Sequence, residues 1–366
     1  MYKLNKQLVS LFCLLYIGIS QVIAGDLMAS KSDDTSQYND GPYLINGKDK
    51  KSSRTLIEHN IINGVYVKHP YLGSIPSNQQ YAINVSDSFN NVSKIAAISD
   101  IHGQFDVFKQ LLNANGVIDD NLDWRFLNGH LVITGDIFDR GDTVTQALWL
   151  VYKLEQQAKA AGGKVHYLLG NHEYMVLRGD ERYIHQKYKH TLNQMNIDLQ
   201  TLFDETTVLG RWLRSKSTVI KINKHVFLHG GIHQDFIDLK MPLEQANHVM
   251  RSSIGVSRDE LKAQTPHKLL FGRTGPIWYR GYFLDPLLSQ KSVDNVLEAL
   301  NADRVVVGHT SMKKIETRFD NRVIAIDTSI KKGKKGEILL IDFNPTKTTY
   351  MRGDMNGEKS PLFNQR

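Results

Sequence analysis

Cysteine is almost absent from this 366-residue chain, which contains one, Cys13. Cys13 lies in an apolar stretch near the start, so a chain cleaved after that stretch has no thiol. Such a protein can have no disulfide framework. It also has no cysteine nucleophile, which excludes every cysteine-based enzyme mechanism.

The chain also lacks an apolar run long enough to cross a membrane. The start, MYKLNKQ, carries two lysines and no acid, and LVSLFCLLYIGIS and QVIA follow before Gly25. This run falls short of the ~20 residues of a membrane span and is typical of a secretory signal peptide. We predict that residues 1–24 are a signal peptide, with an uncleaved anchor as the alternative. The mature protein is then periplasmic or secreted and has no membrane contact.

Charge of one sign is not in large excess either. The formal net charge is +7, and Lys3 and Lys6 of the signal contribute two of these charges. A mild positive balance suits an anionic substrate, although it also suits any soluble protein kept away from zero charge. KKGKK at 331–335 surrounds a glycine between apolar runs and predicts a solvated turn. No basic block is long enough to indicate a nucleic-acid partner.

Three regions follow the signal. Residues 25–93 are polar and contain short β-like pieces, NGVYV and QYAINV, which predict a partly irregular N-terminal arm with a hairpin or two. Residues 94–342 alternate between strand and helix patterns. Residues 343–366 are assigned to a C-terminal tail.

Strand and helix patterns alternate in the central region. Strands are predicted at KIAAIS, HLVIT and KVHYLL, with helices over FDVFKQLLNANG and over DTVTQALWLVYKLEQQAKAAGG, where Asp142 is a capping candidate. This alternation predicts a largely parallel central sheet. Further on, the patterns predict a strand pair at TVIKIN and KHVFLHGG, a helix at VDNVLEAL, and strands at RVVVG, RVIAID and EILLID. Residues 173–217 and 232–291 are predicted to be insertions outside the sheet.

Five short segments each follow a strand pattern and carry metal-type ligands or a glycine beside one. They are SDIHG (99–103), GDIFDRG (135–141), GNHE (170–173), HGG (229–231) and GHT (308–310). Each alone is a weak signal, because a Gly-Asp pair is usually a turn. Sites in open α/β sheets form outside the carboxyl ends of strands. The five segments are therefore predicted to converge on one place.

The residue types in these segments suit a pair of divalent ions. Two ions about 3.5–4 Å apart need several hard ligands, one of which bridges them. Asp100 and His102 alternate along a strand end and can face the same side, and Asp136 is the natural bridge. The neutral ligands of a second ion are then Asn171, His229 and His309. Carboxylates and imidazoles without thiolates predict two ions of Mn, Fe or Zn.

In these five segments, the chain resembles the metal-dependent phosphatases of the phosphoprotein phosphatase type. More narrowly, it is similar to the Shewanella-like protein phosphatases, including their cold-active protein-tyrosine phosphatases. The resemblance covers about residues 94–342. It implies a calcineurin-like αβ sandwich of two mixed β-sheets with flanking helices. It also implies phosphomonoester hydrolysis, favouring phosphotyrosine, by direct attack of a hydroxide shared by two metal ions.

The resemblance also implies residue roles. It places Asp100, His102 and Asp136 on the first ion, and Asp136 on the second together with the three neutral ligands named above. Ser99 departs from the glycine that many relatives have there. Ser311 stands where the GHxH phosphodiesterase pattern has a second histidine, which favours the protein-phosphatase type.

The remaining roles concern the phosphoryl group. His172 resembles the acid that protonates the leaving oxygen, and Asp139 resembles the carboxylate that orients it. Arg140 resembles a phosphate clamp, and the second arginine of the family is assigned to Arg280, with Arg273 as the alternative.

These assignments predict one catalytic domain, because the metal and acid positions span residues 100 to 309. The expected substrate is a phosphorylated protein or a small phosphomonoester, and the expected state is a monomer. A hydrolase of dinucleoside polyphosphates or phosphodiesters is the alternative enzyme, since it uses the same ions with a different pocket. A metal- or phosphate-binding envelope protein is the non-enzymatic alternative, which the presence of His172, Asp139 and Arg140 disfavours.

Overall fold

The computed structural model describes residues 40–46, 53–57, 60–63, 68–69, 73–74, 81, 86–344 and 346–363. The predicted signal peptide lies outside these residues. Among the helices that are described, none combines the length and the apolar character that a membrane span requires.

The first of two six-stranded sheets contains the strands predicted before and after the first two helices. Its order is β17-β16-β15-β7-β8-β9. The strands β7, β8 and β9 are parallel, whereas β15 is antiparallel to β7 and to β16. Their bounds are β7 (Lys94–Ile98), β8 (His130–Ile133), β9 (Lys164–Tyr167), β15 (Ile338–Phe343), β16 (Thr348–Gly353) and β17 (Lys359–Pro361). Residues assigned to a C-terminal tail thus supply β16 and β17 to this sheet.

The second sheet has the order β13-β14-β12-β11-β10-β6. The predicted strand pair β10 and β11 is antiparallel, and β11, β12 and β14 are parallel. The bounds are β6 (Ser88–Phe89), β10 (Val219–Ile222), β11 (His225–Leu228), β12 (Arg304–Val307), β13 (Glu316–Arg318) and β14 (Val323–Ala325). The expected two mixed sheets are confirmed. The prediction of a largely parallel central sheet is wrong, because antiparallel strands extend the parallel strands in both sheets.

The two sheets pack face to face through alternate residues of their strands. In β7, Ile95 and Ala97 belong to the apolar cluster between the sheets, whereas Ala96 and Ile98 belong to the larger cluster on the other face. Since successive side chains of a strand point to opposite faces, β7 is buried on both. This burial explains why KIAAI is apolar throughout and shows no polar alternation.

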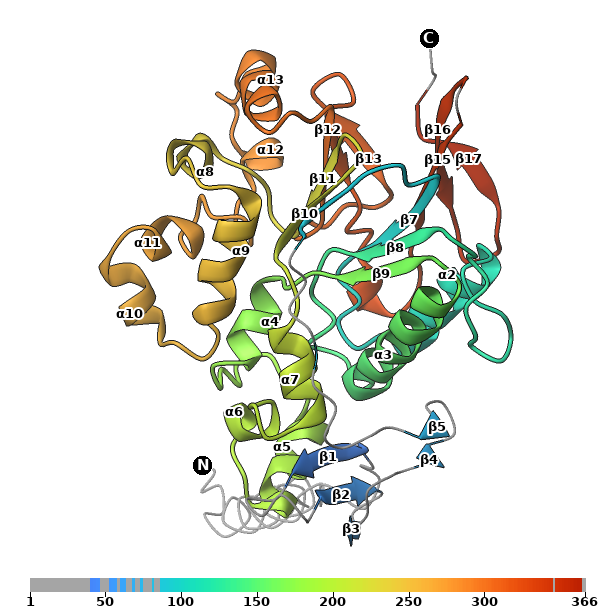
Figure 1. Cartoon of the computed structure of the whole chain (residues 1–366), viewed down its shortest axis with the longest axis vertical. Helices are drawn as coiled ribbons and strands as arrows, with labels where there is room; N and C mark the ends of the chain where they lie inside the picture. Colours follow the sequence, from blue (N-terminus) through green and yellow to red (C-terminus); the bar gives the residue numbers. More distant parts are fainter. Residues whose placement is uncertain are drawn as a thin grey trace, which may run out of the picture. The chain divides into compact units, whose positions relative to one another are not determined.

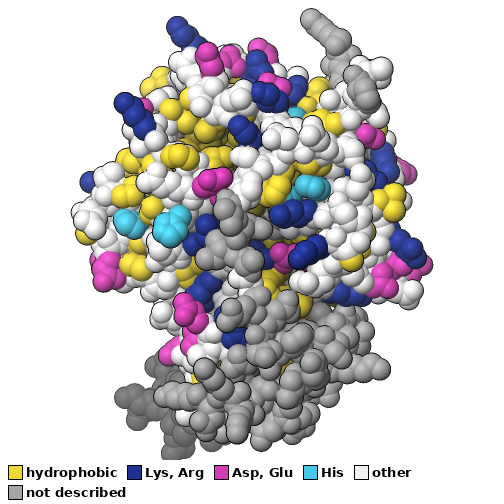
Figure 2. All heavy atoms as spheres, viewed as in Figure 1, with side chains coloured by type: hydrophobic (Ala, Val, Ile, Leu, Met, Phe, Trp, Pro, Cys, Tyr) yellow, Lys and Arg dark blue, Asp and Glu magenta, His cyan; other side chains and the backbone are white. Residues whose placement is uncertain are grey.

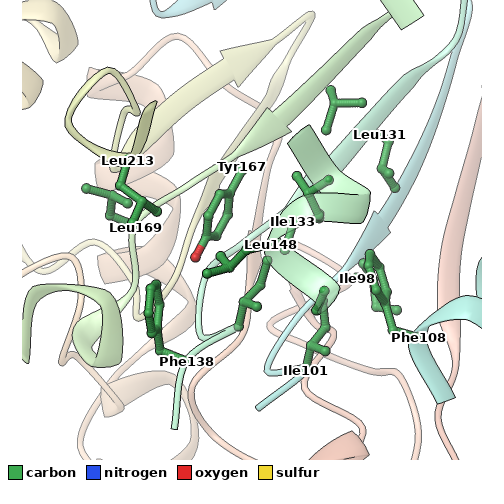
Figure 3. Packing of buried hydrophobic residues seen from close by; sticks show 14 of the residues in the cluster. Ile98, Ile101, Phe108, Leu131, Ile133, Phe138, Leu148, Tyr167, Leu169 and Leu213 are labelled. Atoms are coloured by element: carbon green, nitrogen blue, oxygen red, sulfur yellow. The ribbon is translucent and has the colours of Figure 1, made fainter. Parts of the chain in front are cut away.

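Two helices cover the outer face of the first sheet. They are α2 (Phe105–Ala114) and α3 (Val144–Ala160), and Figure 1 shows both beside β8 and β9. Phe108 of α2 and Leu148 of α3 pack with Ile98, Leu131 and Ile133 (Figure 3).

The capping prediction for α3 is wrong. Thr143, and not Asp142, is the N-cap residue, and no side chain caps the helix. The Thr143 hydroxyl donates instead to the carbonyl of Gly103. The start of α3 is thereby joined to the loop after β7, so this threonine serves the site rather than the helix.

Both predicted insertions contain helices and no strand. The first holds most of α4 (Asn171–Val176), then α5 (Gln186–Met195), α6 (Leu199–Leu202) and α7 (Val208–Arg214). The second holds α8 (Gln234–Asp238), α9 (Leu243–Ser252), α10 (Arg258–Ala263), α11 (His267–Leu270) and α12 (Gly281–Leu284), followed by α13 (Gln290–Ala299). A short 3-10 helix, Ile330–Lys332, opens the lysine-rich turn.

The N-terminal arm forms an antiparallel sheet of β1 (Tyr43–Asn46), β2 (Ser53–Ile57) and β3 (Asn60–Asn63), and a short pair, β4 (Lys68–His69) and β5 (Gly73–Ser74). Of the β-like pieces predicted here, residues 64–67 and 82–85 lie outside the described residues. The arm is anchored to the helices. Lys187 Nζ of α5 lies 2.9 Å from Asp40 Oδ1, and Trp149 Nε1 of α3 donates to the carbonyl of Pro42 at 2.9 Å.

Candidate active site

The loops that follow β7, β8, β9, β11 and β12 meet at the carboxyl ends of these strands, as predicted. The backbone N–H of His102, after β7, donates to the carbonyl of Asp136, after β8, at 2.9 Å. Gly308, after β12, donates to the carbonyl of His229, after β11, at 2.9 Å. His229 Nδ1 donates in turn to the carbonyl of Thr134 at 2.8 Å, which joins the two sheets.

Many of these loop residues have a left-handed backbone. The positive φ angles are those of Asp100 (54°), His102 (49°), Asp136 (58°), Asp139 (72°), Arg140 (71°) and His309 (64°). Such angles are uncommon outside glycine, and residues that adopt them cluster at functional sites. The loops therefore turn sharply enough to bring side chains from several strands into one space.

His229 is at the centre of the second predicted ligand set. Because its Nδ1 donates to a carbonyl, its Nε2 presents a lone pair to the site. Around that atom lie Asn171 Oδ1 at 2.9 Å, His309 Nδ1 at 3.0 Å and Asp136 Oδ2 at 3.1 Å. Ligand atoms bound to one ion at ~2.1 Å lie about 3 Å from each other. The four atoms thus have the spacing of a metal site.

The ligand atoms of this set are hydrogen-bond acceptors, so a positive charge is needed among them. Asp136 Oδ2 and Asn171 Oδ1 can only accept, and they face the His229 Nε2 lone pair. Burial lowers the pKa of His229, but Asp136 and Asp100 outweigh this effect and raise it to about 9, so the surroundings of this imidazole favour a positive charge. None of the described residues forms a hydrogen bond with the buried Nε2 atom of His309. The residues therefore fit a divalent cation with oxygen and imidazole ligands.

The first predicted ligand set converges beside the second. His102 Nδ1 donates to the carbonyl of Phe138 at 2.7 Å, which turns Nε2 toward the site. This Nε2 lies 3.7 Å from Asp100 Oδ1 and 3.7 Å from Asp136 Oδ2. Backbone carbonyls commonly fix metal-binding imidazoles in this way. Asp136 contacts both ligand sets and has the position of a bridging carboxylate.

His172 is held between Asp139 and Arg140. Its Nδ1 donates to Asp139 Oδ2, and its Nε2 lies 3.5 Å from Arg140 Nη2 and 3.9 Å from Asp136 Oδ2. Burial lowers the pKa of His172, but Asp136 and Asp139 outweigh burial and raise it above its ordinary value. The Nε2 atom of His172 thus faces the space between the predicted ligands and Arg140, where a proton donor to the leaving oxygen would have to stand.

Both candidates for the second arginine, Arg280 and Arg273, line the same cleft as His172. Partial burial lowers the pKa of Arg280, whereas the carboxylates of Asp100 and Asp136 oppose the shift. These carboxylates act on Arg280 because it is near them, which favours Arg280 as the second phosphate contact.

Sequence reasoning missed the role of Glu173. This residue is fully buried, and its carboxylate accepts the backbone N–H groups of Asp136 at 2.8 Å, Ile137 at 2.8 Å and Gly170 at 2.7 Å, and the Tyr167 hydroxyl at 2.8 Å. It therefore ties the loop after β8 to the start of α4. The available signal was the charge of Glu173 between neighbours that are buried. A buried carboxylate needs hydrogen-bond donors, so a role in holding backbone N–H groups could be expected.

The two noted departures from related sequences have structural roles. Ser99 is buried, and its hydroxyl donates to Asp100 Oδ2 at 2.6 Å while accepting from Thr134 Oγ1 at 2.7 Å. A serine thus fits at this position and orients a ligand. Ser311 donates to Asp327 Oδ2 at 2.6 Å, so it supports a neighbouring loop.

The site opens into a cleft of about 1200 Å³. Arg140, Asn171 and His172 lie at its inner end, and residues of both insertions, including Tyr183 of the first and Trp278 of the second, line the rest. Trp278 stands edge-on to His309, with the ring centroids 5.6 Å apart. The insertions therefore form walls around the residues at the sheet ends.

Comparison with known proteins is consistent with this geometry. Residues 93–312 match the family model described as calcineurin-like phosphoesterase. An uncharacterised protein of Schizosaccharomyces pombe is 30% identical to this chain, over 72% of this chain and 81% of that protein. Shewanella-like protein phosphatase 1 of Plasmodium berghei is 25% identical, over 72% of this chain and 75% of that protein.

A solved structure is also similar over nearly its whole length. It is the structure of a cold-active protein-tyrosine phosphatase of a psychrophilic Shewanella species. It matches this chain with a TM-score of 0.81 and 38% sequence identity, and the match covers 88% of this chain and 99% of that chain. These matches show the family and its chemistry, and the spacing of the predicted ligands agrees with them. The chain belongs to the calcineurin-like phosphoesterase family, and it is a metal-dependent phosphatase.

Proposed function

We propose that the protein is a protein phosphatase that favours phosphotyrosine. The observation that carries this proposal is the position of Tyr183 at the mouth of the site. Its ring centroid lies 5.4 Å from that of His172, and the Arg140 guanidinium carbon lies 5.6 Å from the Tyr183 ring. The Tyr183 ring is 44% exposed, so its free surface can contact a substrate ring. The likeness to a protein-tyrosine phosphatase also supports the proposal.

The chain's own residues account for binding and orientation. Six residues would hold two cations: Asp100, His102, Asp136, Asn171, His229 and His309. When bound, such a cation pair makes water a nucleophile near neutral pH and neutralises phosphoryl charge.

Three side chains would act on the phosphoryl group itself. Arg140 and Arg280 would bind its equatorial oxygens, where charge accumulates during transfer. His172, oriented by Asp139, would donate its Nε2 proton to the leaving oxygen.

An aromatic leaving group suits the walls of the cleft. A phosphotyrosine ring at the inner end would contact Tyr183 on one side and Trp278 on the other, since both line the cleft. Aromatic pairs of this kind add about 0.5–1.5 kcal/mol beyond the area that they bury. A phosphoserine carries no ring and gains none of this contact.

Replacement of Tyr183 by alanine tests the proposal. We expect kcat/KM for a phosphotyrosine peptide to fall about tenfold, which corresponds to ~1.4 kcal/mol. The value for a phosphoserine peptide with the same flanking residues should change less than about twofold, since no ring contact is lost. Equal losses on both peptides would contradict a ring contact. Leu287→Ala, which removes a side chain that is 89% exposed and not part of the cleft, is the matched control.

A dinucleoside polyphosphate hydrolase would use the same ions, and the cleft is large enough for such a substrate. Diadenosine tetraphosphate should therefore be assayed beside the peptides. A kcat/KM above that of every phosphopeptide would replace the protein-phosphatase proposal with this alternative.

We also propose that the protein is exported and monomeric and that its metal is Mn, Fe or Zn. The lysine-containing apolar start and the thiol-free ligand set support these points. Fractionation of the producing cell, sedimentation and elemental analysis of the purified protein test them in turn.

A further inference from the structure

The outer part of the catalytic cleft is strongly cationic. Apart from Arg140 and Arg280 at its inner end, it is lined by Arg178, Arg182, Arg258, Lys262 and Arg273, and among the described residues that line it Asp285 is the one carboxylate. Figure 2 shows Lys and Arg side chains spread over one face of the molecule, and this group is set apart from them by its position beside the site.

Within the residues that the structure describes, four of these five cations form no ion pair, and three of the four, Arg178, Arg258 and Lys262, lie on or beside helices α4 and α10. Arg182 forms a close ion pair with Asp180, at 2.6 Å. Within the described part of the chain, no carboxylate lies within ion-pair distance of Arg178, Arg258 or Lys262. We name these three residues the outer basic subsite.

Two helices bring the three side chains together. Arg258 and Lys262 lie four residues apart on α10 and therefore share one face of that helix. Arg178 lies two residues beyond the end of α4 and lines the same cleft as Arg258. Burial lowers the pKa of Arg178, and Arg258 and Arg182 lower it further against the opposing effect of Asp180. Like charges held together in this way are stabilised when an anion joins them.

The position of α4 sets the spacing between the two anion sites. His172 is the second residue of α4, and Arg178 comes six residues later. Because α4 ends at Val176, Arg178 lies in the turn beyond the helix, and six residues at about 1.5 Å each place its backbone roughly 9 Å from that of His172. An extended peptide covers the same length in two to three residues at ~3.3 Å each.

We propose that the outer basic subsite binds acidic side chains of the substrate, two to three residues from the phosphorylated one. Resting on the proposed protein-phosphatase function, this inference names the substrate class as phosphopeptide segments rich in Asp or Glu. Peptide carboxylates are the expected occupant because the cleft is long and open, and because its aromatic inner end suits one ring followed by extended chain.

Two phosphotyrosine peptides test the inference, one with Glu and one with Gln at the three positions on each side of the phosphorylated residue. The wild-type protein should prefer the Glu peptide about tenfold in kcat/KM, equivalent to ~1.4 kcal/mol. This preference should shrink as salt rises, because exposed charges are screened. In the double variant Arg258→Gln and Lys262→Gln, the preference should fall to about twofold, since two of the three charges of the outer basic subsite are lost and Arg178 remains.

The controls separate the subsite from the reaction. Turnover of p-nitrophenyl phosphate should be unchanged in the double variant, because this substrate is too short to reach α10. The variant Lys334→Gln and Lys335→Gln removes the same charge from an exposed turn outside the cleft, and it should keep the preference for the Glu peptide. Charge reversal, Arg258→Glu with Lys262→Glu, should favour a third peptide that carries Lys at the flanking positions.

The outcomes also distinguish this inference from the proposed function. An equal rate of the wild-type protein on the Glu and Gln peptides overturns the inference and leaves tyrosine specificity intact. A preference for Glu that survives undiminished in the double variant overturns it too. If only phosphoserine peptides are cleaved, tyrosine specificity fails, and the same Glu and Gln pair built on phosphoserine tests the subsite. A double variant that loses turnover of diadenosine tetraphosphate, with an unchanged peptide ratio, overturns the peptide as occupant.

Discussion

His172 illustrates how single residues carry the chemistry of this site. Its Nδ1 is committed to Asp139, so only Nε2 is available to a substrate, and Arg140 lies beside that atom. The loop that supplies Asp139 and Arg140 has a left-handed backbone at both positions. Strain of this kind costs about 1–3 kcal/mol per residue, and it persists because the side chains are held by the groups around them.

Replacement of His172 by asparagine should separate proton donation from metal binding. Asn171 and the other predicted ligands remain, so metal content measured by elemental analysis should be unchanged. Turnover of phenyl phosphate, whose leaving oxygen needs a proton, should fall by about 10²–10⁴-fold. p-Nitrophenyl phosphate should lose much less. An equal loss on both esters would argue against His172 as the proton donor.

Short junctions between strands and helices carry the ligands at the scale of elements. The loop after β8 supplies Asp136 and is tied to the start of α4 by Glu173. Gly170 precedes α4 with a φ of −90°, which any residue can adopt. Glycine is required here because there is no room for a side chain, and not because of its backbone conformation. A Cβ atom would collide with the Asp136 carboxylate and the His229 ring.

Gly170→Ala should therefore damage the site more than the fold. Displacement of a bridging carboxylate and an imidazole should remove most bound metal and reduce activity by at least about 10²-fold, a loss typical of misplaced catalytic groups. Gly162→Ala is the matched control, because a Cβ there meets nothing within 4 Å although its φ is +77°. It should lower the free energy of unfolding by about 1–2 kcal/mol and retain activity. A Gly170→Ala protein with full metal content and activity would show that the junction is more tolerant than its geometry indicates.

At the scale of the whole molecule, a buried polar contact joins the two sheets. The Nε2 atom of His225, in β11, lies 2.8 Å from the hydroxyl of Tyr350, in β16. Arg304, in β12, donates a hydrogen bond to the same hydroxyl at 2.9 Å. Tyr350 comes from the stretch predicted to be a tail, so the end of the chain takes part in packing the sandwich. Burial, and secondarily Arg304, lowers the pKa of His225 to about 3.

This contact predicts how stability depends on pH. In the unfolded chain His225 takes up a proton near pH 6.5, whereas the folded protein keeps it neutral down to about pH 3. Stability from this residue is therefore lost as pH falls below about 6.5, by at most ~1.4 kcal/mol per pH unit. Urea unfolding of the wild-type protein and of His225→Gln at pH 7 and pH 5 measures the effect. The wild-type protein should lose more stability than the variant, and parallel losses would contradict the assignment.

The order of residues along the chain was enough to predict the strands, the helical insertions and the six metal ligands, whereas the four catalytic residues were predicted from the family resemblance. Strands buried on both faces are recognisable as short apolar runs, and carboxylates directly after them need partners, so both features can be read locally. Residue types alone also limited the metal to those that bind oxygen and imidazole, because no thiol is present outside residue 13.

Tertiary structure decided what depends on contacts between distant segments. Tyr183 and the outer basic subsite could not be assigned in advance, because the loops and helices that they face lie elsewhere in the chain. The split into two sheets depends on how β15 and β10 pair, and antiparallel pairing leaves no local signature in an apolar strand. The choice between Arg280 and Arg273 likewise rests on distance to the Asp100 and Asp136 carboxylates, a quantity that exists only once the chain is folded.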